Sequence, residues 1–294
     1  MEELKIWLAQ PVDAAPLALF RFLFGTTIFL FVISRFRSWH EYYTSSPFYF
    51  HYEITPFIRP CGKIGMFLIL ATNAIALLFF ALGLLYPISA AIAFLTYTYI
   101  FLCDKSCYVN HFYLTALLLF LFCFTGGDRA LSLDHVLFQT EEGTIPYWNI
   151  LIFQLQIAIV YTYAGLNKIN RDWLVCGQSL RSVMTTFEGT TSLKDWSIHH
   201  YCFNETIAAS LKKWFRSDRV ITAACWYSMF LDLTIIWMLL IPATHWFSVP
   251  LYLTFTFFNQ WFFNISTFPY INYAALLLFL SPQFSRTIIN WIGG

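Results

Sequence analysis

Long apolar runs alternate with short polar stretches along the whole chain, and they set its expected architecture. A membrane-spanning helix needs about 20 apolar residues, and this criterion predicts eight spans, at residues 15–35, 65–86, 87–103, 111–126, 147–167, 219–242, 244–263 and 267–282. Tyr86-Pro87 separates the second run from the third and Pro242 separates the sixth from the seventh, which predicts two tight hairpins. The fourth and eighth runs are short, which leaves a re-entrant or strongly tilted course open for each. The pattern predicts an all-α integral membrane protein with about eight transmembrane helices.

Three connections between the predicted spans are too long to be simple turns. Residues 36–64 are rich in Tyr, Phe, His and Pro, which favours a place in the membrane interface. Residues 127–146 carry acidic side chains and are expected to form a solvated loop. Residues 168–218 hold Trp among charged residues and predict short helices on the membrane face, and residues 4–9 predict another interfacial helix. No repeat or low-complexity tract divides the chain, so residues 1–294 are expected to form a single polytopic membrane domain.

Composition supports the membrane assignment and excludes one class of partner. Hydrophobic residues make up 59% of the 294 residues and charged residues only 11%, which is more apolar surface than a soluble domain of this length can bury. Membrane lipid is therefore the expected environment. The formal net charge is +1 and the basic residues are spread over the loops, so no nucleic-acid partner is expected.

The basic residues also bear on orientation. Three of the 17 Lys and Arg residues fall on the same side of the predicted spans as the N-terminus, whereas thirteen fall on the opposite side, which includes Lys168. The positive-inside rule therefore places the Lys168 side in the cytoplasm, although the rule weakens for a loop as long as residues 168–218.

Several kinds of site find no support in the sequence. The spacing Cys103-x3-Cys107 lacks the second pair of ligands that a zinc site needs, so no metal is expected. No G-x-S-x-G nucleophile motif is present, which argues against a hydrolase. Cys176 and Cys202 are expected to be able to form a disulfide if their loop is extracytoplasmic.

Lys168 is the leading candidate for chemistry. The predicted helix that begins near Trp148 carries no charge until Lys168, so the ammonium group lies at the edge of the membrane. Lost hydration disfavours the protonated form there and makes the neutral amine available as a base. The alternative is a lysine that extends along the helix end to reach water.

Three further polar residues fall inside or at the ends of predicted spans. Arg21 lies within the first span and needs a partner, because an arginine that faces lipid costs several kcal/mol. Asp232 is the acidic residue inside another span, so an Arg21–Asp232 ion pair is expected, either to hold helices together or to hold a ligand. His111 begins the fourth span and can hydrogen-bond an oxygen anion, although an interfacial histidine bonded to backbone is the more common case.

Separated sequence blocks give the chain a more specific resemblance. The blocks are Phe20-Arg21-Phe22-Leu23-Phe24-Gly25, Asp104-Lys105 with Asn110-His111-x-Tyr113-Leu114, Pro146-x-Trp148-Asn149, Ala164-Gly165-x-x-Lys168 with Asp172-Trp173, Leu231-Asp232-Leu233 and Ile265-x-x-Phe268-Pro269-Tyr270. In this order, they resemble those of the vitamin K-dependent gamma-carboxylase-like family, which in bacteria is the horizontally transferred transmembrane domain. The resemblance extends over about residues 16–270.

The resemblance implies a lyase or quinol epoxidase in the bacterial inner membrane. Its cofactor would be reduced vitamin K or a menaquinol-like quinol, which reacts with oxygen to form the epoxide and generates a base that lets carbon dioxide add to a glutamate side chain. Lys168 matches the family's catalytic base, and His111 matches the histidine that stabilises the resulting anion. The resemblance also implies that the Lys168 side is extracytoplasmic, and this orientation is preferred over the charge count. The residues expected to surround the ligand are Asn110, Arg21, Asp232, Tyr161, Trp173 and Asn259.

Two departures from the family pattern keep other functions open. Thr256 occupies the place where the family has a histidine, and no C-terminal extracytoplasmic domain for a protein substrate is expected in residues 1–294. The chain could instead be a maturation factor for a small secreted peptide. A further alternative is a non-catalytic membrane subunit that packs against another membrane protein.

Overall fold

Helices form most of the structure, and they follow the apolar runs closely. The computed structural model describes residues 1–46, 48–139, 143–178, 180–181, 217–263 and 265–293. It divides into two units, the first made of Met1–Gln154 and Thr267–Gly294 and the second of Leu155–Ser266. Each unit has its own packing and is described separately.

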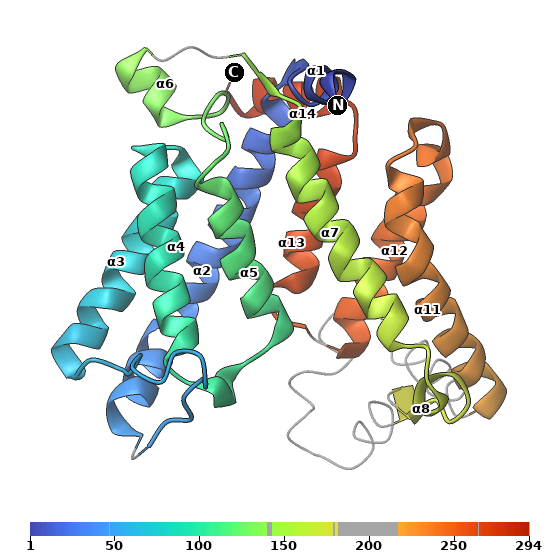
Figure 1. Ribbon diagram of the computed structural model, residues 1–294, viewed down its shortest axis with the longest axis horizontal. Helices are drawn as coiled ribbons and strands as arrows, with labels where there is room; N and C mark the ends of the chain where they lie inside the picture. The colour runs from blue at the N-terminus through green and yellow to red at the C-terminus, as the bar shows by residue number, and fades with distance from the viewer. Residues whose placement is uncertain (47, 140–142, 179, 182–216, 264, 294) are drawn as a thin grey trace. The chain divides into compact units, whose positions relative to one another are not determined.

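The first unit is organised around a long helix, α2, which packs against α3, α13, η5 and α14, while α3, α4 and α5 pack together in chain order. Figure 1 shows α1, α6 and α14 at the same end of this unit as the two termini. The elements are α1 (Glu2–Leu8), β1 (Pro11–Asp13), α2 (Ala15–Ser45), α3 (Lys63–Leu82), α4 (Tyr86–Leu102), η1 (Lys105–Cys107), α5 (Asn110–Phe122), α6 (Leu133–Phe138), β2 (Thr144–Pro146), the first turns of α7 (Trp148–Asn167), α13 (Phe268–Ala275), η5 (Leu276–Leu278) and α14 (Pro282–Gly293).

Phenylalanine rings join the helices of the first unit. Phe122 of α5 lies at the centre, with its ring centroid 4.4 Å from that of Phe153, 5.0 Å from that of Phe80 and 5.7 Å from that of Phe24. All four side chains are fully buried. Since aromatic pairs at these separations add to the stabilisation from burial, this cluster fixes α2, α3, α5 and the start of α7 to one another.

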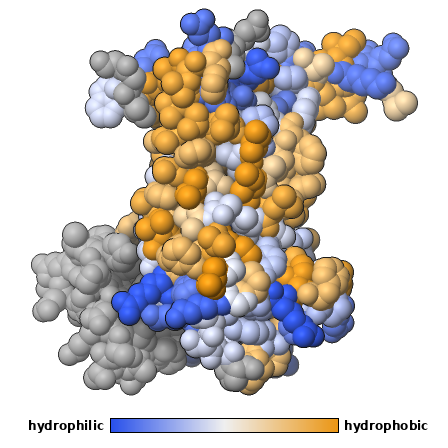
Figure 2. Space-filling model, turned by 90° about the vertical axis from the view of Figure 1, so that its left-hand side faces the viewer, coloured by the Kyte–Doolittle hydropathy of each residue, from blue (hydrophilic) through white to orange (hydrophobic). Residues whose placement is uncertain are grey.

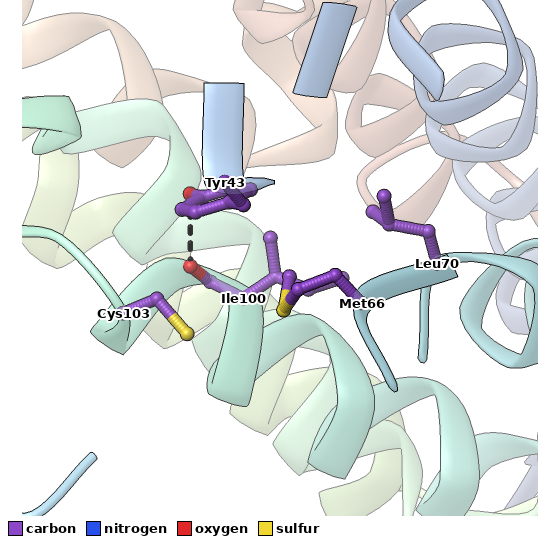
Figure 3. Close-up of a cluster of buried hydrophobic side chains, with 5 residues drawn as sticks. All are labelled: Tyr43, Met66, Leu70, Ile100 and Cys103. Carbon is purple, nitrogen blue, oxygen red and sulfur yellow. Dashed lines mark hydrogen bonds between the residues drawn. The ribbon is translucent and has the colours of Figure 1, made fainter. Parts of the chain in front are cut away.

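A second cluster holds the far end of α2 against α3 and α4. Figure 3 shows its buried side chains, Tyr43, Met66, Leu70, Ile100 and Cys103. The Tyr43 hydroxyl donates a hydrogen bond to the Ile100 carbonyl over 3.1 Å. The polar end of the tyrosine is therefore satisfied inside an otherwise apolar contact.

The second unit contains a helical hairpin. It comprises α7 from Leu155, α8 (Arg171–Leu174), α11 (Asp218–Leu239), η4 (Pro242–Thr244) and α12 (His245–Phe263), and α11 contacts both α8 and α12. Pro242 begins the turn between α11 and α12, as predicted, and a ring nitrogen of His245 lies 2.8 Å from the Leu239 carbonyl. This bond occupies a carbonyl at the end of α11.

The surface supports an integral membrane protein. Among the described residues, α2, α3, α7 and α11 are long and apolar enough to cross a membrane, whereas α4, α5 and Phe268–Leu278 are shorter apolar helices. Exposed apolar residues lie along α3, and Figure 2 shows a hydrophobic band between two ends where hydrophilic residues gather. A helix lies in each of the eight predicted runs, but eight crossings remain a prediction.

The structure corrects two expectations about the connections and adds a helix that was not predicted. The helix predicted to end at residue 35 continues to Ser45, helped by an exposed Arg37–Glu41 ion pair one turn apart. The expected solvated loop at 127–146 contains α6 and β2, and β2 pairs with β1 in antiparallel fashion. The amphipathic helix α14 was missed, because its pattern is too polar to be a span. Most of the long loop at 168–218 lies outside the described residues, including Cys202 of the expected disulfide.

Candidate functional site

Lys168 follows the last residue of α7, where the backbone turns toward α8. Its N–H donates to the Gly165 carbonyl over 3.1 Å. The Asn170 side chain then accepts a hydrogen bond from the Trp173 N–H over 2.8 Å and caps α8. This short turn brings Trp173 back toward the lysine.

The Lys168 ammonium forms an ion pair with Asp232 of α11. The side chains are 17% and 5% exposed, respectively, so water screens the pair only weakly. Lys168 Nζ also lies 4.9 Å from the centroid of the Trp173 ring and 5.9 Å from that of the Phe255 ring of α12. The ammonium group therefore contacts one carboxylate and two aromatic faces.

A close helix contact explains why these two charged residues meet. Gly165 of α7 packs against Leu233 of α11, where a Cβ on the glycine would lie 2.7 Å from the leucine side chain and 3.1 Å from its backbone nitrogen. Lys168 follows Gly165 by three residues and Asp232 precedes Leu233, so this contact brings the ammonium and the carboxylate together. Small residues commonly permit such close approach between membrane helices.

Two tryptophan side chains fix α8 against α11. The Trp173 indole donates to the Cys225 carbonyl over 3.0 Å, and the Trp226 indole donates to the Leu174 carbonyl over 3.1 Å. Because both indole N–H groups are satisfied across the contact, the Trp173 ring is held beside Lys168.

Lys168 lines a cavity of 220 Å³ within the second unit. Its walls are mostly apolar and aromatic, while Lys168, Ser228, Thr254 and Asn259 supply polar groups. The other lining residues are Trp173, Leu180, Ala224, Tyr227, Phe255, Phe258 and Phe263. An apolar pocket with a few polar groups is the usual form of a small-molecule site.

Arg21 has a different environment from the one expected. Its guanidinium is fully buried, donates to the Leu131 carbonyl and lies 5.8 Å from the centroid of the Tyr86 ring. Asp232 pairs with Lys168 instead. The expected Arg21–Asp232 pair is therefore replaced: the arginine donates to a backbone carbonyl within the first unit, and the aspartate pairs with a lysine within the second.

The remaining candidate residues are divided between the units. Tyr161 is buried on α7, and its ring lies 5.8 Å from that of Tyr252 on α12. Asn110 and His111 form the first turn of α5 in the first unit, where the His111 carbonyl accepts a hydrogen bond from Thr115 over 2.9 Å. Lys168, Trp173, Asn259 and Asp232 are brought together, whereas a cavity shared by His111 and Lys168 stays a prediction.

Thr256 is buried on α12, but it does not line the described cavity of the second unit. Its hydroxyl has no hydrogen-bond partner among the described residues. Thr256, which stands where the resemblance implies a histidine, thus lies on the helix that supplies Phe255 and Asn259 but is not part of the cavity wall.

Sequence reasoning missed a polar network and a cavity in the first unit. Asp104 accepts hydrogen bonds from the Tyr42 hydroxyl over 2.5 Å and from the Ser106 N–H over 2.8 Å. The spacing Asp104-x-Ser106 was the available signal, because a side chain that caps the residue two positions later is typical of aspartate. A cavity of 390 Å³ lies beside this network, and its aromatic walls include Trp39 and Phe112.

A family model described as HTTM domain matches residues 9–284 of the chain. No solved structure matches the chain.

Proposed function

From the premise that the chain belongs to the HTTM domain family, we propose that it is a quinol-dependent membrane enzyme in which Lys168 acts as a base. HTTM is the membrane domain of vitamin K-dependent gamma-carboxylase, and carboxylation linked to epoxidation is the proposed reaction. The observation that carries the proposal is that Lys168 lines an aromatic cavity and is held there by Asp232. The proposed location is the bacterial inner membrane.

The cavity suits a ring that carries an acidic hydroxyl. Trp173, Phe255 and Phe258 offer aromatic surfaces to a planar ligand, and Asn259 can donate or accept a hydrogen bond at the wall. When bound, a reduced vitamin K-type or menaquinol-like quinol would supply the electrons for the reaction with oxygen. Lys168 would hold and move the proton of the ring hydroxyl, and the apolar walls would exclude water.

His111 is proposed to assist by hydrogen-bonding the oxygen that loses this proton. A histidine in the first turn of a helix can serve this role, because its ring donates a hydrogen bond and the backbone N–H groups at a helix start favour negative charge. The proposal requires His111 and Lys168 to reach one ligand.

Replacement of Lys168 by arginine tests the base. Arginine keeps the positive charge but does not yield a neutral base at working pH, so Lys168→Arg should lower turnover of a reduced naphthoquinone by about 10²–10⁴-fold. Epoxide formation with oxygen is measured by chromatography on purified protein in detergent. Lys63→Arg is the matched control, since Lys63 is exposed at the start of α3.

Two results would contradict the proposal. If wild-type protein neither retains a quinone in its lipid extract nor forms an epoxide, a non-catalytic membrane subunit or a maturation factor for a small peptide is the better explanation. If Lys168→Arg keeps full activity, another residue is the base.

A further inference from the structure

The ion pair between Lys168 and Asp232 has a consequence for how the lysine can act. Lys168 is an ammonium group in this pair, and an ammonium group cannot accept another proton. Before Lys168 can act as a base, it must therefore pass its proton to a group within hydrogen-bond distance. Among the described residues, Asp232 is the carboxylate at this distance.

The other described groups around Lys168 are not carboxylates within hydrogen-bond distance of its ammonium group. Helix α8 presents Trp173 and α12 presents Phe255 and Asn259, none of which titrates near neutral pH. Helix α11 also carries the Cys225 thiol and the Tyr227 phenol near the lysine. In α8, Arg171 and Asp172 are charged, but both are exposed.

We propose that Asp232 is the positioning residue of this site, holding Lys168 at the cavity wall as a buried ion pair and taking up the lysine's proton when the lysine acts as a base. The second part rests on the proposed function, whereas the first does not. The Gly165–Leu233 contact fixes the geometry of the pair, and the low exposure of both side chains couples their protonation states strongly.

The proton transfers balance without any further reactant. A proton first moves from Lys168 Nζ to the Asp232 carboxylate, so an N–H bond breaks and an O–H bond forms. The neutral amine then takes the proton of the ligand hydroxyl, which leaves its bonding electrons on the ligand oxygen. In sum, one proton passes from the ligand to Asp232, and the negative charge passes from the carboxylate to the ligand oxygen beside the ammonium. The net charge of the buried site stays the same throughout, which avoids the cost of an unpaired ion.

Chemical labelling tests the ion pair independently of turnover. Purified protein in detergent is treated with acetic anhydride at a series of pH values, and acetylation of Lys168 is quantified by mass spectrometry. In Asp232→Asn the amine loses the carboxylate that favours its protonated form, so the midpoint of labelling should move to lower pH by at least about one unit, which is a tenfold change in the neutral fraction. Asp232→Glu should restore most of the wild-type profile.

Asp172→Asn is the matched control, because Asp172 is an exposed aspartate close to Lys168 in sequence. It should leave the labelling midpoint unchanged. An unchanged midpoint in Asp232→Asn as well would overturn the proposal. If Asp232→Asn does not fold, the double variant Lys168→Met with Asp232→Leu should recover the yield from membranes, since it removes both charges together; a double variant that is as poorly folded as the single one also counts against the pair.

Turnover separates a failure of this proposal from a failure of the proposed function. If the wild type oxidises a reduced naphthoquinone, its singly protonated Lys168–Asp232 pair is the reactive form, so its rate falls in acid only when Asp232 is protonated as well. In Asp232→Asn the lysine itself must be neutral, so the acidic limb of the pH–rate profile should move to higher pH, to the labelling midpoint of that variant. A lower rate with an unmoved limb would show a purely structural role for Asp232. If the wild type has no turnover, the proposed function fails, while the labelling shift still decides whether Asp232 controls Lys168.

Discussion

Asp104 is a buried carboxylate whose partners are neutral groups. It accepts hydrogen bonds from the Tyr42 hydroxyl and from the N–H groups of Ser106 and Phe50, over 2.5, 2.8 and 3.2 Å. Burial alone would raise the pKa of Asp104, but these hydrogen bonds outweigh it and hold the pKa below its ordinary value. The residue thus links α2, the loop at 48–62 and the turn before α5 through its ionised form.

This arrangement predicts a pH dependence of stability. Because the folded-state pKa is lowered, the contribution of Asp104 is complete above the ordinary aspartate pKa of about 4 and is lost as the pH falls through the lower folded value. Asp104→Asn should reduce the free energy of unfolding at pH 7 by about 1.5–3 kcal/mol, and the difference from wild type should shrink in acid. Unfolding in mixed detergent micelles at pH 7 and pH 3 measures this. Glu53→Gln, an exposed carboxylate in the same loop, should change little at either pH, and an equal loss in both variants would refute the prediction.

At the scale of elements, contacts between helices select which polar residues meet. Gly165 lets α7 approach α11 at Leu233, and the Trp173 indole attaches α8 to α11. In the first unit, Asp134 caps α4 by accepting hydrogen bonds from the N–H groups of Leu85 and Tyr86 over 2.7 and 2.8 Å. Each of these contacts joins segments that are far apart in the sequence.

Enlarging Gly165 should disturb the site without touching its chemistry. In Gly165→Ala the new methyl group would meet the backbone nitrogen and side chain of Leu233, which should force α7 and α11 apart. A destabilisation of about 1–3 kcal/mol is expected from such overpacking, together with a labelling midpoint of Lys168 that moves to lower pH as its pair with Asp232 loosens. Gly62→Ala is the control, since a Cβ at Gly62 meets nothing within 4 Å; similar effects in both variants would contradict the role of the close contact.

At the scale of the molecule, helix α2 is long and apolar enough for the two ends of the first unit to lie on opposite sides of a bilayer. Helix α2 runs 31 residues from the end that carries α1 and the strand pair to the end that carries the loop at 48–62, which is longer than a bilayer core requires. Figure 2 shows an apolar band between the polar ends of the face that it presents. The charge count and the family resemblance disagree on which end is cytoplasmic.

Cysteine labelling in intact cells decides the orientation. Single cysteines at Arg171 and Arg129, both exposed, are introduced into a protein without its native cysteines. An impermeant maleimide should label position 171 and spare position 129 if the Lys168 side is extracytoplasmic. Labelling of position 129 alone would support the positive-inside rule and reverse the proposed orientation. Labelling in permeabilised cells is the control, because both positions should react there.

The sequence by itself determined where helices form and which polar residues lie inside or at the ends of apolar runs, because helix formation follows the local apolar pattern and a charge inside an apolar run is visible without any structure. It correctly placed a helix in each predicted run, the break at Pro242, and Lys168 at the end of α7. The pairing of buried charges was decided only by tertiary structure: Asp232 meets Lys168 because a glycine allows two helices to touch, and Arg21 instead meets a carbonyl from a loop that was expected to be solvated. Such partners depend on which helix faces pack together, and composition, periodicity and residue spacing do not specify those faces.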